Sequence, residues 1–466
     1  MALIFERIQT AGIAELSYLF GDDSKGIAAV IDPRADVEVY VDLARKHSVS
    51  ITHVFETHIH ADLVSGAREL ADRTGTAEVY VSGEAGARYG FKPKRIKHGD
   101  KFEFGCQVLT VRHTPGHTPE HVSYEVAEKD HLDSPWGVFT GDSLFVNSAG
   151  RPDLLGKDAD KLAAQLYDTL FKYFAKLDAG VIIHPSHGHG SPCGADIGDR
   201  LESTIGYEKK FNPYLQKKDK KAFVEYALSS APPEPTYYKR MKKENAAGPK
   251  VLGNLPGIAA LPANQFKAAV ESGKNVLVDT RSMLAFGGGH IENALSIGAT
   301  PELTVWAGWM LNPATPILLV LNEDAMAEKV VRFFVRSGYT KFAGYLANGM
   351  KAWQNEGYSL VDTPQMTVNE VTTCDGVQVL DVRSPSEWEK GHIPCAKHIF
   401  LPEIPKRVKE LDKKRAVVTY CATGYRASLA SSLLQQEGFK DVRNMPGSFT
   451  AWKNAGLPIE KDGKKS

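Results

Sequence analysis

The sequence is poor in cysteine and has no apolar run long enough to cross a membrane. Its 466 residues include 5 cysteines, an odd number at scattered positions, which does not resemble a disulfide framework. A reducing, cytoplasmic setting fits this usage best. No apolar run approaches the ~20 residues of a membrane-spanning helix. The N-terminus lacks a basic stretch followed by a long apolar block, so we expect neither a secretory signal nor a membrane partner.

An excess of charge of one sign is also absent. Lys and Arg together number 56, as do Asp and Glu, so nothing draws the whole chain toward nucleic acid. Lysines do cluster at 217–221 and again at 239–243. Because no aromatic residues are interleaved with them, we favour a solvated helix face over an RNA-binding patch and expect no nucleic-acid partner. A chain of this length predicts roughly two to four domains.

The first half of the chain has the pattern of one α/β domain followed by a connection. Residues 1–235 alternate short β-rich runs with polar turns and helical patterns. Prolines collect at the end of this segment, and residues 236–250 follow them. We therefore expect a domain over 1–235 and a linker over 236–250.

The remainder of the chain contains an internal repeat. An Asp-x-Arg-Ser sequence preceded by an apolar run begins at Asp279 and returns at Asp381. The offset of about a hundred residues is too long for a solenoid unit and matches one small α/β domain. We therefore expect two copies, over residues 251–361 and 362–466.

The most informative segment of the chain is Thr57-His58-Ile59-His60-Ala61-Asp62-Leu63, which directly follows an apolar-rich run. Two imidazoles and a carboxylate at alternate positions, where a strand ends, can converge on one point, and these donors suit zinc or iron. Three more strand ends carry similar groups, namely His117, Asp142 and a cluster of His184, His187 and His189. Such groups at four strand ends of one domain predict a metal site.

These motifs resemble the metallo-β-lactamase superfamily over residues 1 to about 210, and within it the glyoxalase II and persulfide dioxygenase branch. The resemblance implies an αββα sandwich with the metal at one edge. The first-metal ligands of that family match His58, His117 and Asp142. Residues of its second-metal region match His60, Asp62 and His187, the last chosen over His184 and His189 because it follows Pro-Ser.

Leu63 is where the sequence departs from two-metal members of that superfamily, which carry a histidine there. Leucine cannot bind a metal, so the substitution argues against a binuclear hydrolase. Two imidazoles and one carboxylate are the facial set of non-haem Fe(II) oxygenases, with open positions for a sulfur substrate and O2. We therefore expect one Fe(II) per chain, with zinc as the alternative. His60, Asp62 and His187 then orient ligands or carry protons.

Two residues near the expected site leave alternatives open. Arg151, in a Gly-Arg-Pro-Asp stretch that resembles the same branch, can clamp a carboxylate of a thiol such as glutathione or form a salt bridge with Asp153 or a neighbour. Cys193 lies just past the histidine cluster, where it can relay sulfur or act as a small buried residue. We favour the second interpretation of Cys193.

The second copy of the repeat carries a cysteine loop between an apolar run and a helical pattern. Cys421 begins the loop and Arg426 ends it, with Gly424 between them. The helix dipole and the N–H groups of the loop favour an anion, so the thiol should titrate low. Gly424 permits the tight curl and Arg426 adds positive charge.

The Cys421 loop, the Asp381-x-Arg383 sequence and Gly391-His392-Ile393-Pro394 resemble the rhodanese family. The resemblance implies a three-layer α/β/α domain for each copy. It makes Cys421 and Arg426 catalytic, places Gly424 in substrate binding, and has Cys421 carry sulfur as a persulfide. Cys395 stands where relatives often have glycine, and we interpret it as structural.

The first copy of the repeat lacks the chemistry of the second. It has no cysteine between residues 251 and 361, and its loop reads Asn322-Glu323-Asp324-Ala325-Met326. Acidic side chains would repel a thiolate or thiosulfate, so we expect an inactive rhodanese domain.

The resemblances together imply an α/β multidomain fusion that oxidises a low-molecular-weight thiol persulfide with O2, giving sulfite and thiol. Cys421 would then move sulfur among thiols, sulfite and thiosulfate. The alternative is a zinc-dependent thioester hydrolase of the glyoxalase II kind, and a third interpretation makes the repeats a non-enzymatic docking module. We also expect a homo-oligomer, either a dimer or a tetramer.

Overall fold

The computed structural model describes residues 3–371 and 376–461. The chain divides into two compact units, the first comprising residues 1–255 with 335–338 and the second comprising 256–334 with 339–466. None of the helices formed by the described residues combines the length and the apolar character that a membrane span requires.

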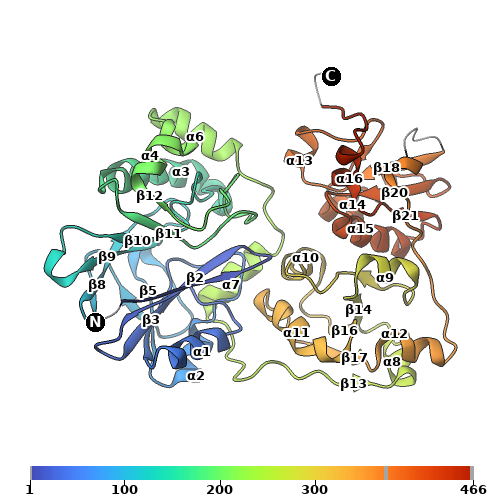
Figure 1. Ribbon diagram of the computed structural model, residues 1–466, viewed down its shortest axis with the longest axis horizontal. Helices are drawn as coiled ribbons and strands as arrows, with labels where there is room; N and C mark the ends of the chain where they lie inside the picture. Colours follow the sequence, from blue (N-terminus) through green and yellow to red (C-terminus); the bar gives the residue numbers. More distant parts are fainter. Residues whose placement is uncertain (1–2, 372–375, 462–466) are drawn as a thin grey trace. The chain divides into compact units, whose positions relative to one another are not determined.

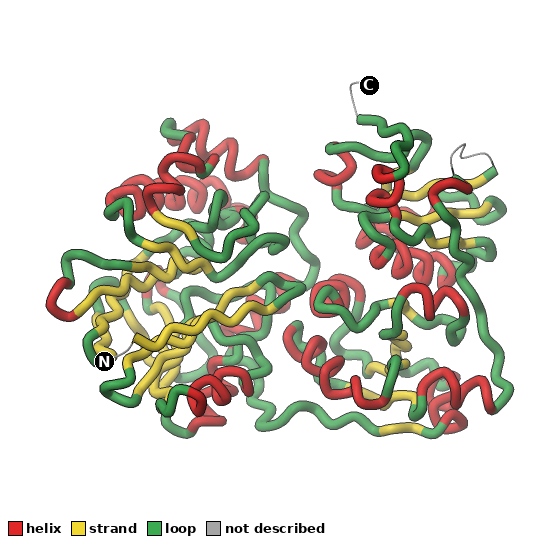
Figure 2. Tube along the Cα trace, viewed as in Figure 1, coloured by secondary structure: helices red, strands yellow, loops and turns green. Residues whose placement is uncertain are grey.

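The first unit contains two six-stranded sheets, each with its strands in the order of the sequence. The first sheet consists of β1 (Leu3–Thr10), β2 (Glu15–Asp22), β3 (Ile27–Ile31), β4 (Ser50–Phe55), β5 (Glu78–Ser82) and β6 (Lys94–Ile96). The second consists of β7 (Lys101–Phe104), β8 (Gln107–His113), β9 (Val122–Glu128), β10 (Gly137–Gly141), β11 (Ile182–Pro185) and β12 (Ser203–Thr204). Figure 2 shows them as two layers of strands with helices on their outer sides.

Apolar side chains from both sheets form the centre of this unit. One cluster joins Tyr18 and Phe55 of the first sheet to Leu109, Tyr124 and Phe139 of the second. The outer faces are covered by α1 (Glu38–Lys46) and α2 (Ala67–Thr74) on one side, and by α3 (Ala159–Asp168), α4 (Ile205–Phe211), α5 (Pro213–Gln216) and α6 (Lys220–Ser229) on the other. The expected αββα sandwich is therefore confirmed (Figure 1).

The second unit contains two parallel sheets, one for each copy of the repeat. The first has the order β13-β17-β16-β14-β15 and the second the order β19-β18-β20-β21. The strands are β13 (Ala260–Leu261), β14 (Val276–Asp279), β15 (Leu295–Ser296), β16 (Ile317–Val320), β17 (Phe342–Leu346), β18 (Val377–Asp381), β19 (Lys397–His398), β20 (Ala416–Tyr420) and β21 (Val442–Asn444). Because near-continuous apolar runs form these short strands, both sheets are covered by helices, as parallel sheets require.

The helices of this unit also divide between the two copies. The first copy has α8 (Ala263–Glu271), α9 (Met283–Gly288), α10 (Leu303–Met310), α11 (Ala327–Arg336) and α12 (Gly349–Asn355). The second has α13 (Pro385–Glu389), α14 (Ile404–Arg407), α15 (Tyr425–Gln436) and α16 (Ser448–Asn454). The repeat extends to side chains, since Arg281 pairs with Asp279 at 2.6 Å and Arg383 pairs with Asp381 at 2.6 Å.

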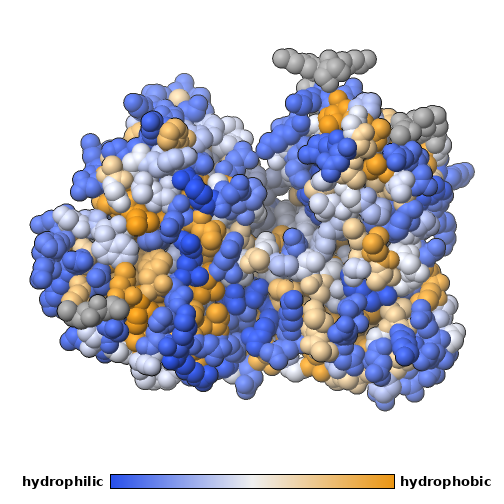
Figure 3. All heavy atoms as spheres, viewed as in Figure 1, coloured by the Kyte–Doolittle hydropathy of each residue, from blue (hydrophilic) through white to orange (hydrophobic). Residues whose placement is uncertain are grey.

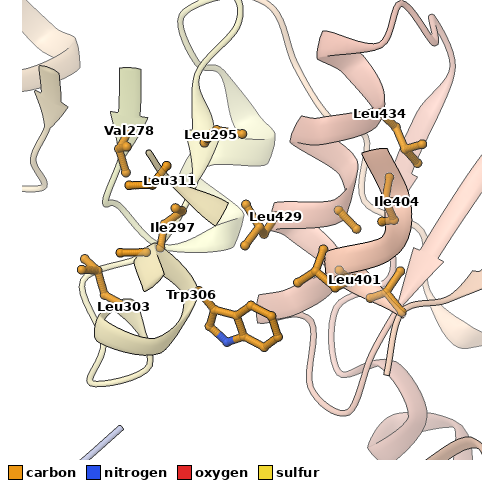
Figure 4. Close-up of a cluster of buried hydrophobic side chains, with 14 of the residues drawn as sticks. Val278, Leu295, Ile297, Leu303, Trp306, Leu311, Leu401, Ile404, Leu429 and Leu434 are labelled. Atoms are coloured by element: carbon orange, nitrogen blue, oxygen red, sulfur yellow. The ribbon is translucent and has the colours of Figure 1, made fainter. Parts of the chain in front are cut away.

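The two copies share one apolar cluster. Figure 4 shows Ile297 and Trp306 of the first copy on one side of this cluster, with Leu401, Ile404 and Leu429 of the second on the other. All five side chains are at most 9% exposed. Burial of apolar area of this kind stabilises a contact by about 25 cal/mol per Å2. The two copies therefore form one compact unit rather than two independent domains joined by a linker.

The segment 236–250 differs from the expected linker. Residues Tyr238–Ala247 form helix α7, which buries Tyr238, Met241 and Asn245 within the first unit. The lysines between these positions mask an apolar face with helical spacing, which is why composition alone indicated a solvated connection.

One cysteine also differs from the expected pattern. Cys395 is disulfide-bonded, whereas the number and spacing of the cysteines had indicated no disulfide framework. A disulfide agrees with the structural role expected for Cys395. Cys106, Cys193 and Cys421 are free thiols. Cys374 lies outside the described residues.

The visible surface is mostly hydrophilic. Figure 3 shows hydrophilic residues over much of the face that it draws, with smaller apolar groups between them. Among the described residues, the exposed large apolar side chains are Leu3, Leu132, Leu155, Tyr207, Phe211, Leu284 and Leu360. Tyr207 and Phe211 of α4 pack against each other with ring centroids 4.6 Å apart, and the other five are far apart in the sequence. Single exposed apolar residues of this kind are ordinary on a protein surface.

Candidate functional site

Three strand ends of the first unit bring His58, His117 and Asp142 together. His58 follows β4, His117 lies in the loop after β8, and Asp142 comes directly after β10. The Nε2 atoms of His58 and His117 lie 3.8 and 3.5 Å from Oδ2 of Asp142. One donor atom from each residue lies within 4.8 Å of the others, and all three residues are buried.

The unpaired atoms of this group fit a divalent metal ion. Nε2 of His58 and Oδ2 of Asp142 are buried without a hydrogen-bond partner, which costs about 1–3 kcal/mol per group if nothing binds them. The opposite ring nitrogens are used, since Nδ1 of His117 donates to the carbonyl of Arg151 (2.9 Å) and Nδ1 of His58 lies 2.9 Å from Oγ1 of Thr57. Each Nε2 lone pair is thereby directed into the site.

The electrostatic state of the two histidines suits metal binding. Burial lowers the pKa of His58 and of His117 well below the usual value, and neighbouring histidines add to the effect. Both rings are therefore neutral near pH 7, the form that binds zinc or iron. Burial raises the pKa of Asp142, partly offset by His187.

His60 does not join the group of His58, although it lies two residues away. Its Nε2 lies 3.2 Å from Oδ1 of Asp32 and 3.0 Å from Oε2 of Glu56. Burial alone would lower the pKa of His60, but the two carboxylates outweigh burial and hold the pKa well above its usual value. His60 thus belongs to a separate buried group with Asp32 and Glu56, and Asp32 also accepts hydrogen bonds from Thr57.

His187 bridges two carboxylates of the site. Its Nδ1 lies 2.7 Å from Oδ1 of Asp142 and its Nε2 lies 2.7 Å from Oδ2 of Asp62. These carboxylates outweigh burial and raise the pKa of His187 well above its usual value. Of the other two histidines of the cluster, His184 is buried among aromatic rings and His189 is exposed.

Cys193 lies beside this bridge. Donor atoms of Asp62, His187 and Cys193 lie within 4.8 Å of one another, while Leu63 is fully buried. Burial raises the pKa of Cys193 well above its usual value, so the group is a neutral thiol. Cys193 is buried, as expected from the interpretation of it as a small buried residue. Its sulfur lies 3.6 Å from the hydroxyl of Tyr238.

Arg151 forms the salt bridge that the sequence left open. Its Nε and Nη2 donate to the two carboxylate oxygens of Asp153 at 2.8 and 2.7 Å, and Nη1 donates to the carbonyl of Pro192 at 3.2 Å. Its backbone carbonyl accepts from His117. In this arrangement Arg151 positions a site histidine through its main chain.

Sequence reasoning missed His121. The main-chain N–H of Asp142 donates to Nε2 of His121 at 2.9 Å, which fixes the carboxylate where β10 ends. Burial lowers the pKa of His121 to about 3, so its ring stays neutral and can accept this bond. The available signal was that His121 continues the four-residue spacing of the histidines at 113 and 117.

The second unit presents the Cys421 loop between β20 and α15. Cys421 is 1% exposed, and its Sγ accepts a hydrogen bond from the N–H of Gly424 at 3.0 Å. Gly424 has φ of 119°, and a Cβ there would lie 2.6 Å from the sulfur of Met283, so only glycine fits. Arg426 donates to both carboxylate oxygens of Glu387 at 2.6 and 2.8 Å.

The equivalent loop of the first copy is stabilised differently. Asp324 accepts a hydrogen bond from the N–H of Asn348 at 3.0 Å, and Met326 packs against the shared apolar cluster. A carboxylate therefore occupies a loop that in the second copy surrounds a sulfur atom.

Comparisons with known proteins agree with this division. The family model described as "Metallo-beta-lactamase superfamily" matches residues 12–187. The model described as "Rhodanese-like domain" matches residues 262–356 and 367–455. A solved metallo-beta-lactamase structure from Staphylococcus aureus subsp. aureus COL is 32% identical with a TM-score of 0.67, covering 74% of this chain and 99% of that chain. The chain belongs to the metallo-beta-lactamase superfamily. Its second half carries two rhodanese-like domains.

Two curated relatives each match less than half of this chain. Hydroxyacylglutathione hydrolase of Rhizobium meliloti is 28% identical over 220 residues, which are 44% of this chain and 83% of the relative. Persulfide dioxygenase ETHE1, mitochondrial, of Bos taurus is 28% identical over 200 residues, which are 43% of this chain and 70% of the relative. The metallo-beta-lactamase fold is thus shared by relatives that are named for two different reactions.

The carboxylate of Glu387 binds the guanidinium of Arg426 in the second rhodanese-like domain. Burial would raise its pKa, but Arg426 and Ser384 outweigh burial and lower the pKa to about 2. Ser384 and Glu387 form a capping box at the start of α13, so the helix supports the carboxylate. Sequence reasoning missed Glu387, although the Ser-x-x-Glu pattern was visible.

We expect Glu387→Gln to destabilise the protein by about 1–3 kcal/mol at pH 7, because Arg426 loses its charged partner. The depressed pKa of Glu387 contributes stability above about pH 4.5, and this contribution is lost as pH falls toward 2. The difference in melting temperature between the variant and wild type should therefore shrink below pH 4.5. Glu389→Gln, on an exposed residue of α13, is the control and should match wild type throughout.

Proposed function

We propose that the metallo-beta-lactamase domain oxidises a low-molecular-weight thiol persulfide with O2 at one iron, giving sulfite and thiol, with water supplying the third oxygen of sulfite and two protons released. We propose further that Cys421 transfers sulfane sulfur between thiols, sulfite and thiosulfate. The observation that carries the first proposal is the group of His58, His117 and Asp142, which offers two imidazoles and one carboxylate with unpaired buried atoms. The persulfide dioxygenase relative and the Cys421 loop in the same chain support it.

In this proposal His58, His117 and Asp142 hold the metal, and the other buried groups orient them. Bound iron supplies O2 activation and a positive centre for the terminal sulfur. His187 holds Asp142 in place and can carry a proton between Asp142 and Asp62.

The chemistry proposed for Cys421 needs only thiol exchange. The thiolate attacks the outer sulfur of thiosulfate, the S–S bond breaks, and sulfite leaves with the electron pair. An acceptor thiolate then takes the sulfur from the Cys421 persulfide and restores the thiolate. The N–H of Gly424 donates to the cysteine sulfur, and Arg426 is the nearby cation that stabilises negative charge.

A zinc-dependent thioester hydrolase is the second candidate, because a hydroxyacylglutathione hydrolase matches the same domain at the same identity. Buried Leu63 disfavours it, since the position offers no ligand for a second metal. The two candidates differ in metal, in oxygen use and in substrate.

The decisive measurement is metal content of the full-length protein together with O2 uptake on glutathione persulfide. We expect one iron per chain and oxygen uptake that a chelator abolishes, while sulfur transfer from thiosulfate to thiol survives chelation. Zinc without oxygen uptake, accompanied by hydrolysis of S-lactoylglutathione, would establish the hydrolase instead.

A further inference from the structure

One face of helix α7 contacts residues of the metal centre. Tyr238, Lys242 and Asn245 are spaced by four and then three residues, so they share a face of the helix. The hydroxyl of Tyr238 lies 3.6 Å from the sulfur of Cys193. Nδ2 of Asn245 donates to the carbonyl oxygens of His60 (2.9 Å) and Leu63 (2.7 Å). Lys242 lies between these two contact points.

The ammonium group of Lys242 is buried and unpaired. Across residues 3–371 and 376–461, no group accepts a hydrogen bond from its Nζ. The acidic groups that act on it electrostatically are Glu120, Glu234 and Asp153, together with the Cys193 thiol. Its charge also acts on His117. Burial lowers the pKa of Lys242, and an anion bound at Nζ would offset this effect and use its unsatisfied donors.

Three other basic side chains of the site, those of Arg151, His60 and His187, have acidic partners in the protein. Arg151 is held by Asp153 and the carbonyl of Pro192. His60 lies between Asp32 and Glu56, and His187 lies between Asp62 and Asp142. Among these basic side chains of the described structure, Lys242 is the one whose buried terminal nitrogen has neither a hydrogen-bond partner nor an ion-pair partner.

We propose that Nζ of Lys242 binds the anionic sulfur group of the ligand at this centre: the perthiolate of the substrate and the sulfite of the product. The proposal deepens the proposed function and rests on it for the identity of the ligand. A lysine ammonium is a compact point charge, which suits one sulfur or a pyramidal oxyanion, whereas a planar carboxylate is better matched by the fork of an arginine. The electrostatic interactions of Lys242 with His117 and Cys193 are the reason for assigning that charge to the reacting end of a substrate.

The test compares Lys242→Met with Lys243→Met in the full-length protein carrying Cys421→Ser, which removes sulfur exchange at the second unit. Lys243 is the neighbouring, exposed lysine of α7 and is the matched control. Sulfite is titrated by calorimetry into each metal-loaded and each metal-free protein. We expect Lys242→Met to weaken sulfite binding at least tenfold in both forms and to leave metal content unchanged, while Lys243→Met binds as wild type does.

Thermal stability separates a binding role from a structural one. Methionine in place of an unpaired buried ammonium should keep or raise the melting temperature, whereas loss of a structural ion pair would lower it. Lys242→Arg should recover part of the sulfite affinity. Unchanged sulfite binding in Lys242→Met, or no sulfite binding by wild type, overturns the proposal.

Oxygen uptake distinguishes this proposal from the proposed function. If wild type consumes O2 with glutathione persulfide, Lys242→Met should raise KM at least tenfold, and an unchanged KM overturns the role of Lys242 alone. If wild type consumes no O2 but binds sulfite through Lys242, the anion site stands and the dioxygenase reaction fails.

Discussion

Replacing His117 with alanine should remove the metal and reduce oxygen uptake roughly 100-fold or more, because even loss of an outer partner of a metal ligand costs about 10–100-fold. His117 contributes one of three donors, and its ring is fixed from behind by the carbonyl of Arg151. No neighbouring imidazole can replace it, since His121 already accepts from the main chain of Asp142. Metal content and O2 uptake on glutathione persulfide measure the effect.

Two further variants test the assignment of His117. His189→Ala, at an exposed histidine of the same sequence cluster, should keep both metal and activity. His60→Ala should retain most of the metal while losing stability, because it leaves Asp32 and Glu56 buried without their cation. Complete metal loss in His60→Ala, with metal retained in His117→Ala, would contradict the proposed ligand set.

The convergence of the metal group could be predicted from the sequence because it depends on local features. His58, His117 and Asp142 each follow an apolar strand, and strand ends at one edge of a sandwich lie close together. The separation of His60 from this group could not be predicted in the same way. Alternate positions suggest a common direction, but Nε2 of His60 lies 3.2 Å from Oδ1 of Asp32, a residue distant in the sequence, and so joins a different group.

The packing of helix α7 against the metal centre could not be predicted from the sequence, for a related reason. Lysines dominate its composition, so the pattern indicated a solvated face, whereas Tyr238 and Asn245 are buried against loops that lie far away in the sequence. Burial of one lysine among several exposed ones is a tertiary effect. No count of charges along the segment can distinguish Lys242 from Lys243.

The repeat was more predictable, because each copy is a short, locally encoded unit. The aspartate and arginine two residues apart pair in both copies, as Asp279 with Arg281 and Asp381 with Arg383. The apolar cluster that joins the copies could not be read from the sequence, because Trp306 and Leu429 approach each other only after both have folded (Figure 4).

Cys421→Ser should abolish sulfur transfer from thiosulfate, by roughly a thousandfold or more, because a hydroxyl neither forms a persulfide nor ionises near pH 7. Serine is smaller than cysteine and can accept the hydrogen bond from the N–H of Gly424, so the loop should keep its shape. Thiocyanate release from thiosulfate and cyanide, and mass spectrometry of the persulfide, measure the loss.

The same variant tests whether the two chemistries are separate. If the metal centre alone oxidises the persulfide, Cys421→Ser retains oxygen uptake but no longer converts sulfite to thiosulfate, so sulfite accumulates. Cys106→Ser, at another free thiol, is the control and should change neither reaction. Loss of oxygen uptake in Cys421→Ser would mean that the persulfide reaches the metal from Cys421. Full sulfur transfer in the variant would make the rhodanese-like domains a docking module, which the glycine-restricted loop and the Arg426–Glu387 pair argue against.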